Sequence, residues 1–499
     1  MEFKPRRIVK TLTSESTSLG GKTARSSFWL LSAQLGNRIF DFARTIVLAR
    51  LLAPADFGLF GVVLLVSSIL DTFTQTGFQQ ALIQNRDDSD CLLNTAWTVT
   101  IIKSVIVAAL LLAASFFAPS FFNSADAGPL LRVFALNSVI NGLSNIKAVY
   151  LQKEMMFHKQ FIFVMLGTLA YTTVSIALAV ILKNAWAMVI GTIAGSLVSC
   201  IVSYIVIPYR PVLELAKEKV AKLWKFGKWL TGSSVLTFLL TDADDLLVSK
   251  LLGTETLGYY QMSYKISNLP STEITSVISG ATFPAYASIQ DRHDKLQLAF
   301  SKVFRTICFL SIPLGAAIFA LSASFTNLFL GEKWASIIPV IQLLVVWGVI
   351  RSLVATTSSV LMAIGRPKLM TILQAGQVVL MYIGIVPLTL SYGIIGTSTA
   401  VVASALIMFF ARVYFSATAI GLRLSKIFVP VITSIGSVAL SIVAVLLFRY
   451  YFSFSTAFQF ILEVLLFTLL YLVSSAIMAK VIKIYPLRIF RYMFEKLLK

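Results

Sequence analysis

The sequence predicts an all-α polytopic membrane protein with about fourteen transmembrane helices, because it is too apolar and too poor in charge for a soluble fold. Hydrophobic residues make up 57% of the 499 residues and charged residues only 13%, against about 25% in an ordinary soluble domain. The mean hydropathy is +0.85. This composition excludes a soluble globular protein, a disordered chain and a fibrous protein.

A helix needs roughly 20 mostly apolar residues to cross a bilayer, and such stretches recur along the whole chain. The first 26 residues are polar and basic and lack an apolar core, so they are not a cleaved signal peptide and the first span is expected to be retained. The spans are expected at residues 27–50, 57–82, 93–118, 128–151, 160–182, 185–207, 228–252, 257–284, 300–328, 336–363, 369–391, 393–417, 427–448 and 457–479.

Lys and Arg are distributed unevenly between alternate loops. If the N-terminus is cytoplasmic, most of them fall on the cytoplasmic side, including those of the two tails and of the loop at 208–226. Cytoplasmic loops carry an excess of Lys and Arg, so both termini are expected in the cytoplasm. The net charge of +20 is then explained by loops that face anionic lipid headgroups, and no nucleic-acid partner is expected.

The segment 28–60 is repeated at 228–260 without a gap, at an offset of 200 residues. Six spans precede the second copy, so both copies enter the membrane in the same direction. This pattern predicts two six-helix lobes related by a pseudo-twofold axis along the membrane normal, the architecture of an alternating-access transporter. The matching pairs include Trp29 with Trp229, Leu51-Leu52 with Leu251-Leu252, and Gly58 with Gly258.

The expected organisation follows from the repeat and the loops. The loop at 208–226 mixes Leu and Val with Lys on one expected helix, which predicts an interfacial helix on the inner leaflet, with partner binding as the alternative. The last two spans lie outside the repeat and carry a solitary charge, Glu463. The expected parts are a cytoplasmic N-terminal tail (1–26), an N-lobe (27–207), a cytoplasmic amphipathic linker (208–226), a C-lobe (227–418), an accessory helix pair (419–480) and a cytoplasmic basic amphipathic tail (481–499).

A family resemblance lies in the segment after the first span. It reads Arg50-Leu51-Leu52, Pro54 and Asp56-Phe57-Gly58, then Gly77 and Ala81-Leu82-Ile83-Gln84. With the Lys225-to-Leu230 start of the second copy, it resembles the Wzx-type polysaccharide-unit flippases of the multidrug/oligosaccharidyl-lipid/polysaccharide exporter superfamily, and the colanic-acid exporters among them. The resemblance implies a transporter, not an enzyme.

The implied activity is the movement of undecaprenyl-diphosphate-linked oligosaccharide repeat units across the bacterial inner membrane, for assembly of an exopolysaccharide or O-antigen-type polysaccharide. The expected partners are that lipid-linked oligosaccharide, membrane lipids, a polysaccharide polymerase and a chain-length regulator. The functional unit is expected to be a monomer. A multidrug or cation antiporter and a lipid II flippase of the same superfamily remain alternatives, although a cationic cavity disfavours cationic cargo. A membrane-embedded glycan polymerase or ligase is disfavoured, because no loop of fifty or more residues separates the spans.

Charged residues inside the spans are the candidate site, because a charge at the bilayer centre costs about 3 kcal/mol or more unless it faces water or a partner. Spacings of three and four residues place Arg38, Asp41 and Arg44 on one helical face, for which we favour a cavity lining over local pairing. The arginine guanidinium can donate two parallel hydrogen bonds to one phosphate group. The candidates for pyrophosphate binding are Arg38, Arg44, Lys103, Lys147, Lys265 and Arg351. Local pairing of Lys103, and extension of the Lys147 side chain to the headgroups, are alternatives.

Acidic residues inside the spans suggest coupling to H⁺ or Na⁺, and no other cofactor is expected. Three aspartates crowd one turn at 242–245 and cannot all remain ionised at low cost; pairing with Lys265, Arg351 or N-lobe arginines is an equal alternative. Pro270 is the hinge candidate. The ion-coupling or gating candidates are Asp41, Asp71, Asp242, Asp244, Asp245 and Glu273.

Two further expectations concern energy and charge pairing. The chain has no Walker A motif, only two histidines and three widely spaced cysteines, so neither direct ATP hydrolysis nor a metal site is expected. Arg44 and Asp244 occupy equivalent positions in the repeat, which suggests that they pair in one access state. Pairing of Asp244 within its own lobe is an equal alternative.

Overall fold

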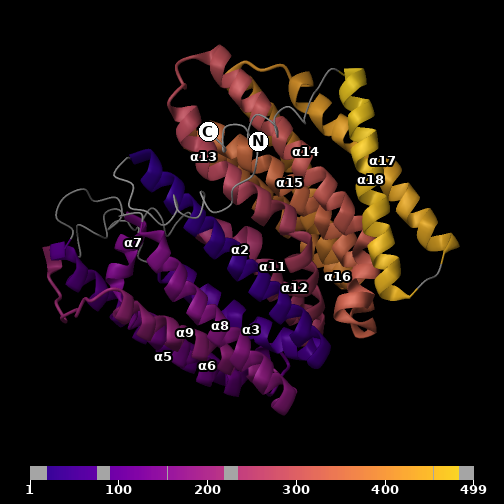
Figure 1. Cartoon of the computed structure of the whole chain (residues 1–499). Coiled ribbons are helices and arrows are strands. Elements are labelled where there is room, and N and C mark those ends of the chain that lie inside the picture. The colour runs from indigo at the N-terminus through magenta and orange to yellow at the C-terminus, as the bar shows by residue number, and fades with distance from the viewer. Residues whose placement is uncertain (1–18, 76–89, 154–155, 219–233, 453–454, 483–499) are drawn as a thin grey trace, which may run out of the picture. The chain divides into compact units, whose positions relative to one another are not determined.

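A computed structural model of the chain (Figure 1) describes residues 19–75, 90–153, 156–218, 234–452 and 455–482. Within these ranges the regular elements are all helices. The tails expected at 1–26 and 481–499 lie mostly outside the described residues, although α2 already begins at Leu19. The main helices are α2 (Leu19–Leu51), α3 (Pro54–Phe73), α5 (Asp90–Phe121), α6 (Ala127–Gly142), α7 (Val149–Lys153), α8 (Phe157–Leu182), α9 (Trp186–Val206), α11 (Ala243–Leu252), α12 (Thr254–Ser267), α13 (Ser276–Ala287), α14 (His293–Phe325), α15 (Ile338–Ala363), α16 (Pro367–Ile420), α17 (Ser425–Tyr451) and α18 (Thr456–Ile482).

The all-helical membrane architecture is confirmed. Nine helices of the described residues are long and apolar enough to cross a membrane, and these range from 20 to 54 residues. The 54-residue α16 is interrupted at Gly393, whose φ of 59° and ψ of −142° are not helical, so its two halves correspond to two expected spans. The charged helix α2 is not among the nine. The count of fourteen spans therefore stays a prediction.

Both copies of the sequence repeat contain the same helix–break–helix. α2 ends at Leu51 and α3 begins at Pro54, and 200 residues later α11 ends at Leu252 and α12 begins at Thr254. Proline suits the first turn of α3 because it has no N–H to leave unpaired, and the Asp56 carboxylate accepts the N–H of Ala53 at 2.9 Å. In the second copy Gly253 makes the break with a φ of 91°, which favours glycine. The motif residues at 77–84 lie outside the described residues.

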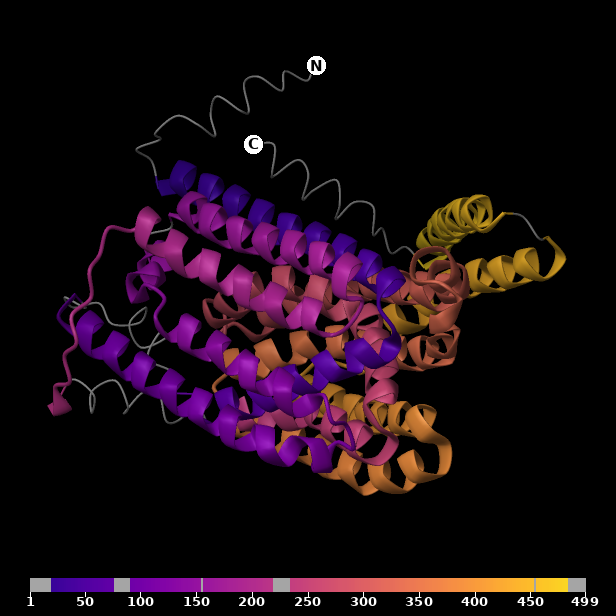
Figure 2. The ribbon, with the colours of Figure 1, turned by 90° about the horizontal axis from the view of Figure 1, so that it is seen from below.

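The chain divides into two compact units, residues 1–238 and 239–499. In the first unit α8 packs against α9 and α2, and α5 packs against α6 and α3 (Figure 2). Small residues allow α8 and α9 to approach closely, since a methyl group added at Gly191 would lie 1.9 Å from the Ser175 hydroxyl oxygen. This close packing fixes α8, which carries a residue of the candidate site.

In the second unit α14 is the central helix of one packed layer. It contacts α15 on one side and α17 and α18 on the other, and α17 and α18 lie side by side (Figure 1). α15 also packs against α12 and α16. Phe300 and Phe304 of α14 are fully buried and stack with ring centroids 5.8 Å apart. The accessory pair is therefore docked on a helix with a well-packed core.

The expectation of an amphipathic helix in the linker is wrong for its first half, because residues 208–216 are not helical. The N–H of Val212 donates to the Asn94 side chain at 3.2 Å, and the N–H of Glu214 donates to the Thr98 hydroxyl at 2.9 Å. Pro208 and Pro211 disfavour helix, and α5 supplies acceptors for the extended backbone. Residues 219–226 lie outside the described residues.

Candidate functional site: charged residues within the helices

The polar face of α2 is built around a buried arginine. Arg44 is 7% exposed and forms an ion pair with Asp41, one turn earlier on the same helix. Its guanidinium carbon lies 3.6 Å from the ring centroid of Tyr171 on α8. Arg38, one further turn along the face, is exposed. The spacing thus correctly placed Asp41 beside Arg44, and α8 supplies the aromatic surface that covers Arg44. A cavity lining formed by this face stays a prediction.

The position of Tyr171 is set by α9. A methyl group added at Gly195 would lie 2.8 Å from the Tyr171 β-carbon and 3.0 Å from the Gly167 carbonyl oxygen. Below Tyr171 on α8, the Thr168 hydroxyl lies 2.7 Å from the side-chain oxygen of Asn37 on α2. The α2 face is therefore held by a polar contact and a cation–π contact, each with α8.

Two further cations of the first unit have partners nearby. Lys103 of α5 pairs with Asp71 of α3 at 3.2 Å, so local pairing is what the structure shows for both candidates. Lys147 lies in the 3₁₀ segment Ile146–Ala148, with its ammonium nitrogen 5.8 Å and 5.5 Å from the ring centroids of Tyr150 and Tyr209. Lys147 is therefore placed beside the linker segment and not on the α2 face.

In the second unit each of the three crowded aspartates accepts its own hydrogen bond. Asp244 is 2% exposed and accepts the Tyr260 hydroxyl at 2.6 Å. The Gln261 amide donates to Asp245 at 2.7 Å, and the Thr241 hydroxyl donates to Asp242 at 2.6 Å. The donors to Asp244 and Asp245 are thus neutral side chains of α12, and the donor to Asp242 is the adjacent Thr241. The second oxygen of Asp244, Oδ1, is buried and has no hydrogen-bond partner among the described residues.

Arg351 of α15 is joined to this acidic group only through tyrosines. It donates to the Tyr264 hydroxyl at 3.4 Å, and its guanidinium carbon lies 5.1 Å from the Trp347 ring centroid. The rings of Tyr264 and Tyr260 are 6.4 Å apart. In the described part of the chain no ion pair joins Arg351 to Asp244. The second unit therefore holds a line of polar aromatic rings between a buried acid and a cation.

Pro270 marks a change of helix type. It begins a π-helix, Pro270–Thr275, between α12 and α13, and the α15 backbone approaches this break closely. A methyl group added at Gly348 would lie only 2.2 Å from the Ser267 carbonyl oxygen. Glu273 falls on the π-helix, but its side chain is outside the described residues, and Lys265 is exposed on α12. The hinge role of Pro270 stays a prediction.

The charge expected to be solitary is paired. Glu463 of α18 is completely buried and receives two hydrogen bonds from Arg449 of α17, at 3.0 and 2.7 Å. Arg449 also donates to the Ala320 carbonyl oxygen of α14 at 2.7 Å. Arg449 lies just beyond the span expected at 427–448, yet α17 extends to Tyr451 and includes it. The description of Glu463 as solitary was therefore wrong.

The sequence did not indicate several partners of the candidate charged residues, because these partners are neutral side chains. Tyr171, Tyr260, Tyr264 and Trp347 were left out of the candidate site, since aromatic residues in membrane proteins are most often interfacial. A usable signal exists in part: Tyr260 and Tyr264, and likewise Trp347 and Arg351, are four residues apart and share a helical face. Arg44 and Asp244 each have a partner within their own unit, so their mutual pairing stays a prediction.

Residues 47–339, more than half of the chain, match the family described as "Polysaccharide biosynthesis protein". The chain belongs to this family. The lipopolysaccharide biosynthesis protein WzxC of Escherichia coli (strain K12) is 29% identical over 355 residues, which are 70% of this chain and 71% of that protein. The succinoglycan biosynthesis transport protein ExoT of Rhizobium meliloti (strain 1021) is 22% identical over 321 residues, 64% of this chain and 65% of ExoT.

Solved structures show the same fold. The lipid II flippase MurJ, in an inward closed conformation, matches with a TM-score of 0.72 at 16% identity, covering 91% of this chain and 99% of that one. An inward-facing multidrug resistance MATE family transporter of the MOP superfamily matches with a TM-score of 0.59 at 18% identity, covering 77% and 95%. The resemblance to polysaccharide-unit exporters of this superfamily is therefore confirmed in family and in fold.

Proposed function

We propose that this protein is an alternating-access flippase for undecaprenyl-diphosphate-linked oligosaccharide units. The observation that carries the proposal is the match of residues 47–339 to a polysaccharide biosynthesis family on a chain with a transporter fold. WzxC and ExoT are named for lipopolysaccharide biosynthesis and succinoglycan transport, which supports a glycan cargo. The cargo would be delivered to polysaccharide assembly in a bacterial inner membrane, with a polymerase and a chain-length regulator as partners and a monomer as the functional unit.

The charged groups of α2 support a diphosphate cargo. Fixed cations replace the hydration of a pyrophosphate, and arginine binds phosphate oxygens at two points. Arg38 is exposed and forms the accessible end of the face, whereas Arg44 is buried between Asp41 and Tyr171. In this proposal Arg38 contacts the cargo directly. Arg44 binds the cargo once its ion pair with the Asp41 carboxylate has opened.

The acidic group of α11 supports coupling to H⁺ or Na⁺. Asp244 keeps one oxygen for Tyr260 and has a second, buried oxygen without a hydrogen-bond partner among the described residues. A buried carboxylate oxygen without a partner costs free energy, and a bound proton or cation would remove that cost. Asp244 is therefore the coupling residue of this proposal, and Asp242 and Asp245 are the acidic residues beside it in the sequence.

A depletion experiment tests the function. In a strain that carries this protein as its sole exporter for one glycan, depletion should stop polymer export and leave lipid-linked repeat units in the inner leaflet. Loss of a polymerase would instead leave single repeat units accessible at the outer leaflet. Single units accessible to an external glycosidase after depletion would therefore contradict flippase activity.

Purified protein in liposomes separates the flippase from a multidrug antiporter. We expect translocation of a labelled undecaprenyl-diphosphate oligosaccharide and no transport of ethidium. Transport of ethidium without translocation of the glycolipid would overturn the proposal in favour of cationic cargo. Lipid II, added as a competitor, tests the third candidate cargo: inhibition by lipid II alone, and not by the oligosaccharide lipid, would also count against it.

A further inference from the structure

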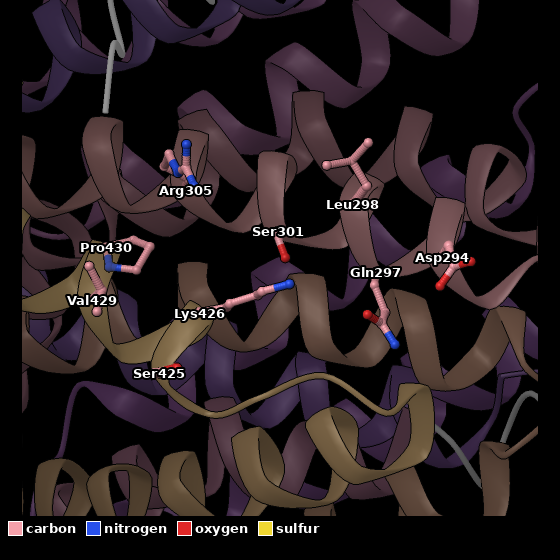
Figure 3. Close-up of a pocket in the computed structure, with 9 residues that line it drawn as sticks. All are labelled: Asp294, Gln297, Leu298, Ser301, Arg305, Ser425, Lys426, Val429 and Pro430. Atoms are coloured by element: carbon pink, nitrogen blue, oxygen red, sulfur yellow. The ribbon is translucent and has the colours of Figure 1, made fainter. Parts of the chain in front are cut away.

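A cavity of about 560 Å³ opens between α14 and the start of α17, and its lining includes none of the charged groups described above. Figure 3 shows the residues of both helices that line it. Its polar lining comes from α14 and α17, with Asp294, Gln297, Ser301 and Arg305 on the first helix and Ser425 and Lys426 on the second. The cavity thus lies where the accessory helix pair begins.

Two cations line the cavity without a counter-ion. Neither the Arg305 guanidinium nor the Lys426 ammonium forms an ion pair or a side-chain hydrogen bond within the described part of the chain. The Arg305 Nε and the Ser301 hydroxyl oxygen are both buried and have no hydrogen-bond partner in those residues. Unpaired buried donors cost free energy, so this arrangement is better satisfied by an anion than by the protein alone.

The acidic residue of the lining does not neutralise these cations. Asp294 is eleven positions before Arg305 on α14, which corresponds to about 16 Å along a helix axis. Figure 3 shows Asp294 at the far end of the group, beyond Gln297, while the Lys426 side chain extends toward Ser301. The cations of the lining are therefore Lys426, whose side chain extends toward Ser301 in Figure 3, and Arg305, one turn farther along α14. The start of α17 adds a helix dipole that also favours an anion.

We propose that this cavity binds the phosphate headgroup of an anionic phospholipid, with its acyl chains along the exposed apolar flank of the same helices. Two apolar side chains of this flank line the cavity: Leu298 is 58% exposed and Val429 is 39% exposed. Ile432, one helical turn beyond Val429 on α17, is 66% exposed. A soluble phosphate would leave this apolar flank uncovered, whereas the acyl chains of a phospholipid would cover it.

The bound lipid would act as a bridge between α14 and α17. Both helices would contribute a cation to one phosphate, so the headgroup would hold the accessory pair against α14 at this end. At their other ends Arg449 already joins α17 to α14 and α18. The site requires only phosphate at the membrane surface, so it does not depend on the cargo proposed above.

The test compares lipids and variants of the purified full-length protein by native mass spectrometry and by thermal unfolding. Phosphatidylglycerol should bind more tightly than phosphatidylcholine and should raise the Tm. Arg305→Ala with Lys426→Ala should weaken phosphatidylglycerol binding about tenfold or more, as expected for lost hydrogen bonds to a charged group. Lys302→Ala is the matched control, because Lys302 is an exposed cation on α14 that does not line the cavity.

Three outcomes would overturn the proposal. The first is equal binding of the two lipids by the unchanged protein. The second is unchanged phosphatidylglycerol binding in the double variant, or in Lys426→Ala alone, which replaces an exposed side chain and so should not disturb folding. The third is displacement of phosphatidylglycerol by millimolar inorganic phosphate, which would identify a soluble anion as the occupant. Arg305→Lys should retain part of the affinity, because it keeps the charge and loses the Nε donor.

Discussion

The guanidinium of Arg449 and the carboxylate of Glu463 form a two-point ion pair, at 3.0 and 2.7 Å, that joins α17 to α18. The Glu463 side chain has no solvent exposure, and Gln459 donates to the same carboxylate at 3.2 Å. Arg449 also reaches the Ala320 carbonyl of α14. Three helices are therefore held at one point by one arginine, in a membrane protein where hydrophobic burial alone does not drive helix association.

Glu463→Ala should destabilise the protein by about 3–5 kcal/mol, because it leaves the partly buried Arg449 charge without its carboxylate partner. Thermal unfolding in detergent measures the change. Arg449→Met with Glu463→Leu removes both charges and should cost less than either single change. A double variant as unstable as the sum of its two single changes would show that the pair carries no coupling.

Arg38 and Arg44 should separate transport from stability. Arg44→Ala should lower both glycan export and thermal stability, the latter by about 2 kcal/mol, because it removes a desolvated cation–π contact and an ion pair. Arg38→Ala changes an exposed residue and should lower export while the Tm stays unchanged. Normal export by the Arg38→Ala/Arg44→Ala double variant would refute their role in pyrophosphate recognition.

Tyr171 should act through Arg44. Tyr171→Phe keeps the aromatic face and should export glycan normally, whereas Tyr171→Leu removes the cation–π contact, whose carbon-to-centroid distance is 3.6 Å. Gly195→Val should resemble Tyr171→Leu, since its side chain would meet the Tyr171 β-carbon. Export assays at matched protein levels in the membrane check the series. Equal export by the Phe and Leu variants would assign Tyr171 a packing role only.

Tyr260→Phe removes the hydrogen bond that the Tyr260 hydroxyl donates to the buried Asp244 carboxylate and should destabilise the protein by about 1–3 kcal/mol. Asp244→Asn keeps an acceptor for Tyr260, so its stability should be close to that of the unchanged protein, while ion-driven transport should be lost. Uptake into liposomes with imposed H⁺ or Na⁺ gradients provides the measurement. Full ion dependence in Asp244→Asn would exclude Asp244 as the coupling residue.

The topology prediction can be checked on one helix. In a Cys-free protein, Ser425→Cys and Tyr450→Cys lie near opposite ends of α17, and both positions are exposed. A membrane-impermeant maleimide added to intact cells with permeable outer membranes should label position 450 and not position 425. Leu213→Cys, at the 70% exposed Leu213 of the linker, should also resist labelling. The reverse pattern would place both termini outside.

The sequence alone determined the features that depend on composition and periodicity. Apolar length predicts helices that cross a bilayer, and the offset of 200 residues predicted equivalent elements, which the breaks at Pro54 and Gly253 show in the backbone. Helical spacing correctly placed Asp41 and Arg44 together, because neighbours on one helix are fixed by local geometry.

Only the tertiary structure decided which residues meet across helices. Arg449 with Glu463, Arg44 with Tyr171 and Asp244 with Tyr260 are joined by helix packing, over sequence separations of 14, 127 and 16 residues. The first half of the linker is likewise not helical, because side chains of α5 accept hydrogen bonds from the linker backbone. Periodicity shows which face of a helix is polar, but the choice of partner depends on the neighbouring helix and on the cost of leaving a buried charge unpaired.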